Sequence, residues 1–202
     1  MISGLKTRTD ARIERGLRRA RWALVALLCA AAPAWALDLN ELMGLLAKQK
    51  QGEANFTEQR YVRGFDGPLA AAGTLSFTAP DRLVRRTLTP RPETMSVDGN
   101  NLTLSRGGRS RTMTLDSVPE LLGLVEAMRA TLAGNGAVLD RYFDTRLSGA
   151  PAEWALDLSP KDGRLSSQVA SLRLVGKAGE VLGVEMEFRG GDRSVMTITP
   201  KR

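Results

Sequence analysis

Along most of the chain after about residue 50, apolar and polar side chains alternate with a period of two, the pattern of strands that bury one face. The clearest alternating runs lie at 73–80, 93–99, 154–160 and 181–191. Turn residues such as Asp98-Gly99 separate the runs and indicate tight hairpins. We expect about six strands before the middle of the chain and about five after it, and the short connections favour antiparallel pairing between consecutive strands.

The segment 117–134 breaks this alternation, because its apolar residues have the spacing of one helical face. Its apolar stripe consists of Leu121, Leu124, Val125, Met128 and Leu132. Ser117 and Glu120 have the spacing of a capping box, and Pro119 suits a first helical turn. Gly134 is a natural end to the helix. The pattern therefore predicts one amphipathic helix between the two groups of strands.

A shorter helix is predicted over about 39–51, before the first strand. Asp38 and Asn40 can cap its first turn, and Gly52 is expected to end it. Its apolar stripe is Leu39, Leu42, Met43 and Leu46.

Strands that each have one apolar face must bury that face against something. A sandwich, a closed barrel and a strongly curved sheet all achieve this, and about eleven strands suit a barrel or half-barrel. The two predicted helices are available to cover its mouth or its concave side. Two interpretations of the central helix remain open: it closes an apolar cavity in the sheet, or its stripe packs on an ordinary filled core.

If the cavity exists, its wall and lid come from the inward positions of the strands and from the central helical stripe. The candidate residues are Phe56, Leu75, Phe77, Leu83, Met95, Val97, Leu102, Met113, Leu121, Leu124, Val125, Met128, Leu132, Trp154, Leu156, Leu172, Leu174 and Met186. The flexible thioether of methionine suits a surface that accepts varied acyl chains. Methionine also fills ordinary cores, so its frequency here is compatible with both interpretations.

Residues 1–36 have the composition of a cleavable signal peptide. A cluster of arginines precedes an apolar run, and Ala34-Trp35-Ala36 fits the small-residue rule for cleavage. We therefore expect export to the periplasm and a single mature domain over 37–202.

Removing the predicted leader changes the meaning of the strong positive charge. The whole sequence has 29 Lys and Arg against 22 Asp and Glu, a net charge of +7. The leader contains seven of the basic and two of the acidic residues, which leaves 22 and 20 in the remainder and a net charge of +2. A domain so nearly neutral is not expected to bind nucleic acid.

The sequence contains no histidine, which excludes Ser-His-Asp and Cys-His catalysis and most zinc sites. Glu185 and Glu187 form the most obvious carboxylate pair, but they alternate with apolar residues and fit a solvated strand face better than a glycosidase acid pair. Arg82, Arg85 and Arg86 could bind a phosphate or carboxylate head group, although charges that protect an edge strand are the simpler explanation. We therefore expect no catalytic residues, no cofactor and no metal site.

Several segments resemble the LolA family, the periplasmic carriers of outer-membrane lipoproteins. The similarity lies in ANFTEQR at 54–60, AGTLSFTAPDRL at 72–83 and ETMSVDGNNLTL at 93–104, followed by the central helix and the closing strands. The motifs APDRL, RTLTPRP and VDG most closely resemble the LolA-related proteins associated with outer-membrane lipid or aryl-polyene biosynthesis.

This resemblance implies an incomplete, strongly curved antiparallel barrel of eleven strands, with a helical lid over a cavity that takes acyl chains. The implied function is a non-catalytic, monomeric carrier that moves a lipoprotein or lipid from an inner-membrane donor complex to an outer-membrane acceptor. An alternative on the same fold is a lipid sensor or adaptor that acts through a protein partner.

One position departs from the family pattern. True lipoprotein carriers have an arginine before the proline that Pro80 matches, and that arginine fastens the lid, whereas this chain has Ala79 there. The tryptophan usual a few residues later is replaced by Arg85. We therefore expect the lid of this protein to be controlled differently.

Overall fold

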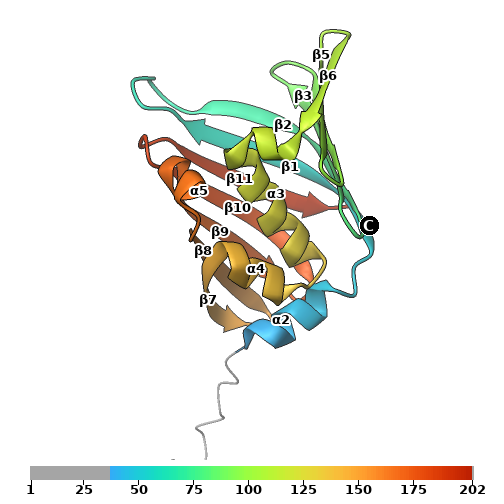
Figure 1. The fold of residues 1–202 in the computed structure, drawn as a ribbon, viewed down its shortest axis with the longest axis vertical. Helices are drawn as coiled ribbons and strands as arrows, with labels where there is room; N and C mark the ends of the chain where they lie inside the picture. Colours follow the sequence, from blue (N-terminus) through green and yellow to red (C-terminus); the bar gives the residue numbers. More distant parts are fainter. Residues whose placement is uncertain (1–36, 202) are drawn as a thin grey trace, which may run out of the picture. The chain divides into compact units, whose positions relative to one another are not determined.

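The structure, a computed structural model, describes residues 37–201 and contains one antiparallel sheet of eleven strands with helices over one of its faces (Figure 1). The first six strands are β1 (Gln51–Tyr61), β2 (Leu69–Thr78), β3 (Arg82–Thr89), β4 (Glu93–Asp98), β5 (Asn101–Arg106) and β6 (Arg109–Thr114). The other five are β7 (Phe143–Ala150), β8 (Glu153–Pro160), β9 (Val169–Lys177), β10 (Glu180–Phe188) and β11 (Arg193–Pro200).

The strands follow the order β6-β5-β4-β3-β2-β1-β11-β10-β9-β8-β7, and the sheet does not close. Consecutive strands are antiparallel neighbours within each group, and the pairing of β1 with β11 joins the two groups into one sheet. The prediction of six strands before the central helix and five after it is confirmed, as is the open, mainly β architecture.

The central helix is α3 (Pro119–Leu132), preceded by the 3₁₀ turn η1 (Leu115–Ser117). The predicted capping role of Ser117 is wrong, because the helix is preceded by Val118 and the Ser117 hydroxyl donates to the Thr114 carbonyl at 2.6 Å within the 3₁₀ turn. The predicted end is confirmed. Gly134 has φ +66°, and the Asn135 N–H donates back to the Ala130 carbonyl at 2.7 Å, a left-handed helix end that glycine favours.

The first helix, α2 (Leu39–Leu46), is shorter than predicted. Its cap is as expected, since the Asp38 carboxylate accepts from the Glu41 N–H at 2.7 Å. Gly52 does not end the helix but lies in β1, where it pairs with Phe77 of β2.

Two further short helices were not predicted: α4 (Gly136–Tyr142), directly before β7, and α5 (Gly163–Gln168), between β8 and β9. Each has fewer than two full turns, too few to show a helical period in the sequence. Side chains cap both helices: Asn135 accepts from the Val138 N–H, and Asp162 accepts from the Arg164 and Leu165 N–H groups.

The apolar face of the sheet is covered unequally. Over β7–β11, helices α2, α3, α4 and α5 contribute to a packed core that includes the fully buried Trp154 and Leu156. A smaller cluster forms at the other end, where Leu115 and Val125 meet Val97 and Leu102 of β4 and β5. A cavity lies between α3 and the middle strands, and members of both clusters line it.

We expect Gly134→Ala to destabilise the protein by about 3 kcal/mol. The new methyl group would add left-handed backbone strain and would lie 2.2 Å from the Met43 carbonyl of α2. The matched control is Gly64→Ala, which also has a positive φ, +85°, but no atom within 4 Å of the added methyl group, and should cost only about 1 kcal/mol. Urea unfolding measures both, and equal losses would show that the close approach of α2 to the end of α3 is unimportant.

Candidate functional site

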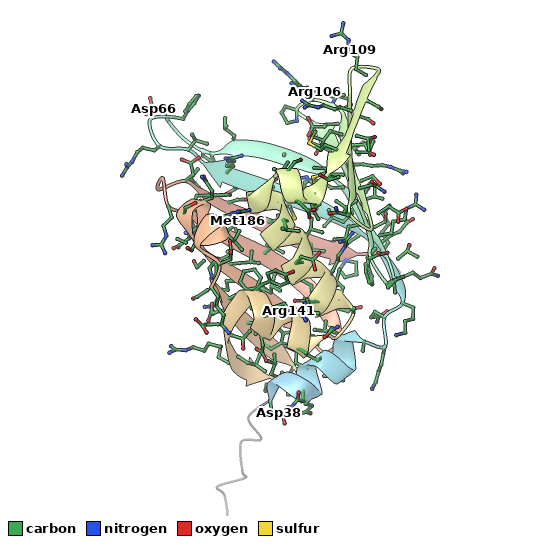
Figure 2. All side chains as sticks on the ribbon, viewed as in Figure 1. Asp38, Asp66, Arg106, Arg109, Arg141 and Met186 are labelled. Carbon is green, nitrogen blue, oxygen red and sulfur yellow. The ribbon has the colours of Figure 1, made fainter. Side chains whose placement is uncertain are left out.

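An apolar cavity of about 330 Å³ lies between α3 and the face of the sheet that this helix covers. Ten of the predicted residues line it: Leu75, Phe77, Leu83, Met95, Val97, Leu124, Val125, Met128, Leu132 and Met186. The β10 and β11 side of the wall adds Val181, Val184, Met196, Ile198 and Pro200, and Ala54 of β1 and Val84 of β3 also belong to the apolar lining. Met186 lies in the middle of the domain, whereas Asp66, Arg106 and Arg109 lie at the tips of hairpins (Figure 2).

The other eight predicted residues do not line the cavity. Trp154, Leu156, Leu172 and Leu174 are buried in the core over β8 and β9. Leu102, Met113 and Leu121 belong to the smaller cluster at the end of α3. Phe56 is on the cavity side of β1 but is buried at 2% exposure beneath Arg85. The period of two indicates which side chains point inward where the strand is regular, but it carries no information on how tightly the opposite layer packs against them.

A β-bulge explains part of the lining that the sequence analysis missed. The pairing of β10 with β9 shifts register between Val181 and Gly183. Strict alternation places Leu182 on the same face as Val184 and Met186, but the extra residue brings Val181 to that face instead and leaves Leu182 half-buried.

One polar cluster interrupts the apolar wall. The Arg85 guanidinium of β3 donates to the Glu58 carboxylate of β1 at 2.5 Å, and the Ser194 hydroxyl of β11 donates to the other oxygen of Glu58, also at 2.5 Å. The guanidinium lies 4.6 Å from the centre of the Phe56 ring. We call Arg85, Glu58 and Ser194 the polar cluster; all three line the cavity.

Arg85 of β3 reaches Glu58 of β1 across β2, at a point where β2 has a glycine. Phe56 pairs with Gly73 of β2, and a methyl group at residue 73 would lie 2.9 Å from the Phe56 ring and 1.9 Å from the Arg86 carbonyl. Glycine at this position therefore allows Phe56, and above it Arg85, to lie across β2 toward Glu58.

The interpretation of the basic strand as a protected edge is wrong. The strand β3 lies inside the sheet between β2 and β4, and the edges are β6 and β7. Arg85 points to the cavity, while its neighbours Arg82 and Arg86 are exposed. The strand alternation could have revealed this cluster. Arg85 is two residues from the inward Leu83, and Glu58 is two residues from the inward Phe56, so both share the inward face of their strands.

A second arginine ties α3 to the sheet. Arg129, only 11% exposed, donates from Nε to the Asp81 carbonyl at 2.8 Å and from Nη2 to the Gly99 carbonyl at 2.6 Å. These carbonyls belong to the turns between β2 and β3 and between β4 and β5. Glu126, one turn earlier in α3, accepts from Nη1 at 3.1 Å. We call this set of contacts the Arg129 clasp.

In residues 37–201, no group of three or more Cys, Asp or Glu side chains is placed to hold a metal ion. Glu185 accepts from Arg193 at 2.8 Å on the face away from the cavity, and this hydrogen bond raises the pKa of Arg193, as expected for a solvated pair. No helix in this part of the chain combines the length and apolar character that a membrane span requires.

The family described as "Outer membrane lipoprotein carrier protein LolA-like" matches residues 30–199. No curated protein matches the sequence. Among solved structures, a LolA superfamily protein from Nitrosomonas europaea is 12% identical, with 80% of this chain and 89% of that chain covered and a TM-score of 0.45.

Two further solved structures are similar in fold. The MucA/MucB complex of Pseudomonas aeruginosa gives 14% identity over 81% of this chain and 56% of that chain, with a TM-score of 0.43. The Mycobacterium tuberculosis lipoprotein LppX gives 8% identity over 80% of this chain and 93% of that chain, with a TM-score of 0.40. Because all three TM-scores are below 0.5, only the family match bears on what the chain does.

We expect Arg129→Met to loosen α3 without unfolding the domain. The substitution removes the donors of the Arg129 clasp but keeps an unbranched apolar side chain in place of the arginine stem, and it should cost about 1–2 kcal/mol. Hydrogen exchange should become faster in α3 and in the two turns that it contacts.

The matched control is Arg141→Met, which changes an exposed arginine of α4 (Figure 2). Exchange in α3 that is as slow in Arg129→Met as in this control would contradict the clasp.

Proposed function

The chain belongs to the LolA-like family of outer membrane lipoprotein carrier proteins, and we propose that it binds acyl chains in the cavity beneath α3 and carries them through the periplasm. The observation that supports this proposal most directly is the cavity itself, whose lining is apolar apart from the polar cluster, the half-buried Ser76 and an exposed rim.

The size of the cavity sets what it holds in this conformation. A volume of about 330 Å³ is at the lower end of the range of about 300–1,000 Å³ found for ligand pockets. Burying about ten methylene groups contributes about 8 kcal/mol, and part of this is lost to ordering the chain. One acyl chain therefore suffices for useful binding, and a cargo with several chains requires α3 to move outward.

The Arg129 clasp gives a physical route for that movement. The family pattern has a lid-fastening arginine at the position of Ala79. Here the backbone N–H of Ala79 donates to the Lys50 carbonyl at 2.8 Å, and Arg129 of α3 takes over the fastening role. Both carbonyls bound by Arg129 belong to turns, where water can replace the guanidinium when the helix lifts. Entry and release of cargo then need only these hydrogen bonds and the apolar contacts of α3 to break.

We propose further that residues 1–36, which lie outside the described residues, direct export and are removed. The cargo is a lipoprotein or a lipid, received from an inner-membrane donor complex and passed to an outer-membrane acceptor by a monomeric carrier.

A second candidate is a lipid-responsive adaptor that acts through a protein partner. The observation in its favour is the hairpin of β5 and β6, which projects beyond the rest of the sheet and ends at the exposed edge strand β6 (Figure 1). Isolation of one partner protein in equal amount with this chain, in a complex that depends on bound lipid, would favour the adaptor over the carrier.

We expect Leu124→Glu to weaken binding of acyl ligands strongly while the domain stays folded. Leu124 lines the cavity from α3, and a carboxylate there cannot be solvated once the chain of a ligand is bound. Displacement of Nile red by a monoacylated lipid should weaken at least tenfold, with cooperative thermal unfolding retained.

The matched control is Leu88→Glu, which introduces the same charge at a leucine of β3 that is 60% exposed. Unchanged binding in the Leu124→Glu variant would contradict the proposed cavity site, and global unfolding would show that α3 is ordinary core.

The proposed leader is tested by the mass of the protein recovered from the periplasm. We expect a chain that begins at Leu37, because Ala34 and Ala36 fit the cleavage rule. Recovery of the protein only with residues 1–36 attached would contradict export by a cleaved signal.

A further inference from the structure

The polar cluster is the one part of the described cavity wall, away from its exposed rim, where charge meets the apolar space. Arg85 and Glu58 are 27% and 14% exposed, and Ser194 is buried. The strand positions that pair with Arg85 are Leu75 and Met95, both of which line the cavity, so apolar surface flanks the guanidinium on its two neighbouring strands. A ligand whose acyl chain lies on that surface passes directly by the cluster.

The guanidinium is held in place before any ligand arrives. The ring of Phe56 supports its face, and Glu58 fixes one edge. Glu58 is fixed in turn by Ser194. A donor that is already oriented loses little conformational entropy when a ligand binds, which favours recognition at this point.

The cluster offers donors rather than acceptors. A guanidinium has five N–H groups, and among the described residues only Glu58 accepts a hydrogen bond from Arg85. Each oxygen of Glu58 already accepts one hydrogen bond, from Arg85 or from Ser194. A ligand group that contributes an acceptor therefore fits the cluster best.

The charge of the cluster argues against an anionic acceptor. Glu58 already balances Arg85, so a carboxylate or phosphate would leave one uncompensated negative charge beside Glu58 in an apolar cavity, which is costly. An uncharged carbonyl accepts the same hydrogen bonds without that cost.

We propose that Arg85, held by Glu58 and Phe56, binds the uncharged ester or amide carbonyl that joins an acyl chain to its head group. This inference rests on the proposed function, because it assigns a chemical class to the ligand of the same cavity. The cluster selects neutral acylated molecules over free fatty acids.

A purely structural role is the competing explanation. The ladders between β1 and β2 and between β2 and β3 already join the strands that the ion pair spans. An ion pair that only supported the sheet would not change the order in which ligands bind, and this difference can be measured.

The test uses the full chain and two probes of equal chain length, dodecanoate and N-methyldodecanamide, at pH 8. Each displaces Nile red, an uncharged dye that reports the cavity. The wild-type protein should bind the amide more tightly. In Glu58→Gln, Arg85 keeps its charge without compensation, so the ratio of the two dissociation constants should shift at least tenfold toward dodecanoate.

A second variant removes both charges. Arg85→Gln combined with Glu58→Gln should weaken amide binding about tenfold, because the charged donor is lost, while Nile red still binds. The matched control is Arg173→Gln combined with Asp157→Gln, which removes an ion pair of 2.8 Å between β8 and β9 on the face away from the cavity. It should leave both probes unaffected.

Two results would overturn the inference while the cavity function stands. In the first, both variants bind Nile red but leave the two probes unchanged, so the cluster does not contact the ligand. In the second, the wild-type protein prefers dodecanoate, so the cluster recognises anions. Failure of the wild-type protein to bind Nile red or either probe would instead refute the proposed function itself.

Discussion

One face of the eleven-stranded sheet is apolar and must be kept from water, and the helices cover this face only in part. Four helices cover the β7–β11 half so closely that Trp154 and Leu156 are fully buried. Over the middle strands α3 is the only helix whose side chains line the described cavity, and its stripe does not reach the sheet everywhere. The cavity is thus what remains when a curved sheet is covered by fewer side chains than would fill it.

Among the described helices, α3 differs from the others because its side chains line the cavity. Its C-terminal end is held by the close approach of Gly134 to α2 and, in the last helical turn, by the Arg129 clasp, which joins it to two turns of the sheet. The first contact is a tight packing of backbone and the second is a set of hydrogen bonds that water can replace.

The strands and the central helix could be predicted from the sequence because each has a long periodic pattern and clear end signals, such as Gly134. Other features depend on information that no single segment contains. Whether Leu124 meets empty space or another side chain depends on the layer opposite, and the bulge that turns Val181 inward depends on pairing with β9. The polar cluster was missed for the same reason, since Arg85 and Glu58 meet only because Gly73 lies between them in the sheet.

The central claim is that an acyl chain occupies the space under α3, and methionine methyl NMR tests it most directly. Of the six methionines in residues 37–202, Met95, Met128, Met186 and Met196 line the cavity, and Met43 and Met113 do not. With the methyl ester of a spin-labelled fatty acid bound, the account predicts strong broadening of the four lining methyl signals and little effect on the other two. Equal broadening of all six, or none at saturating ligand, would contradict it.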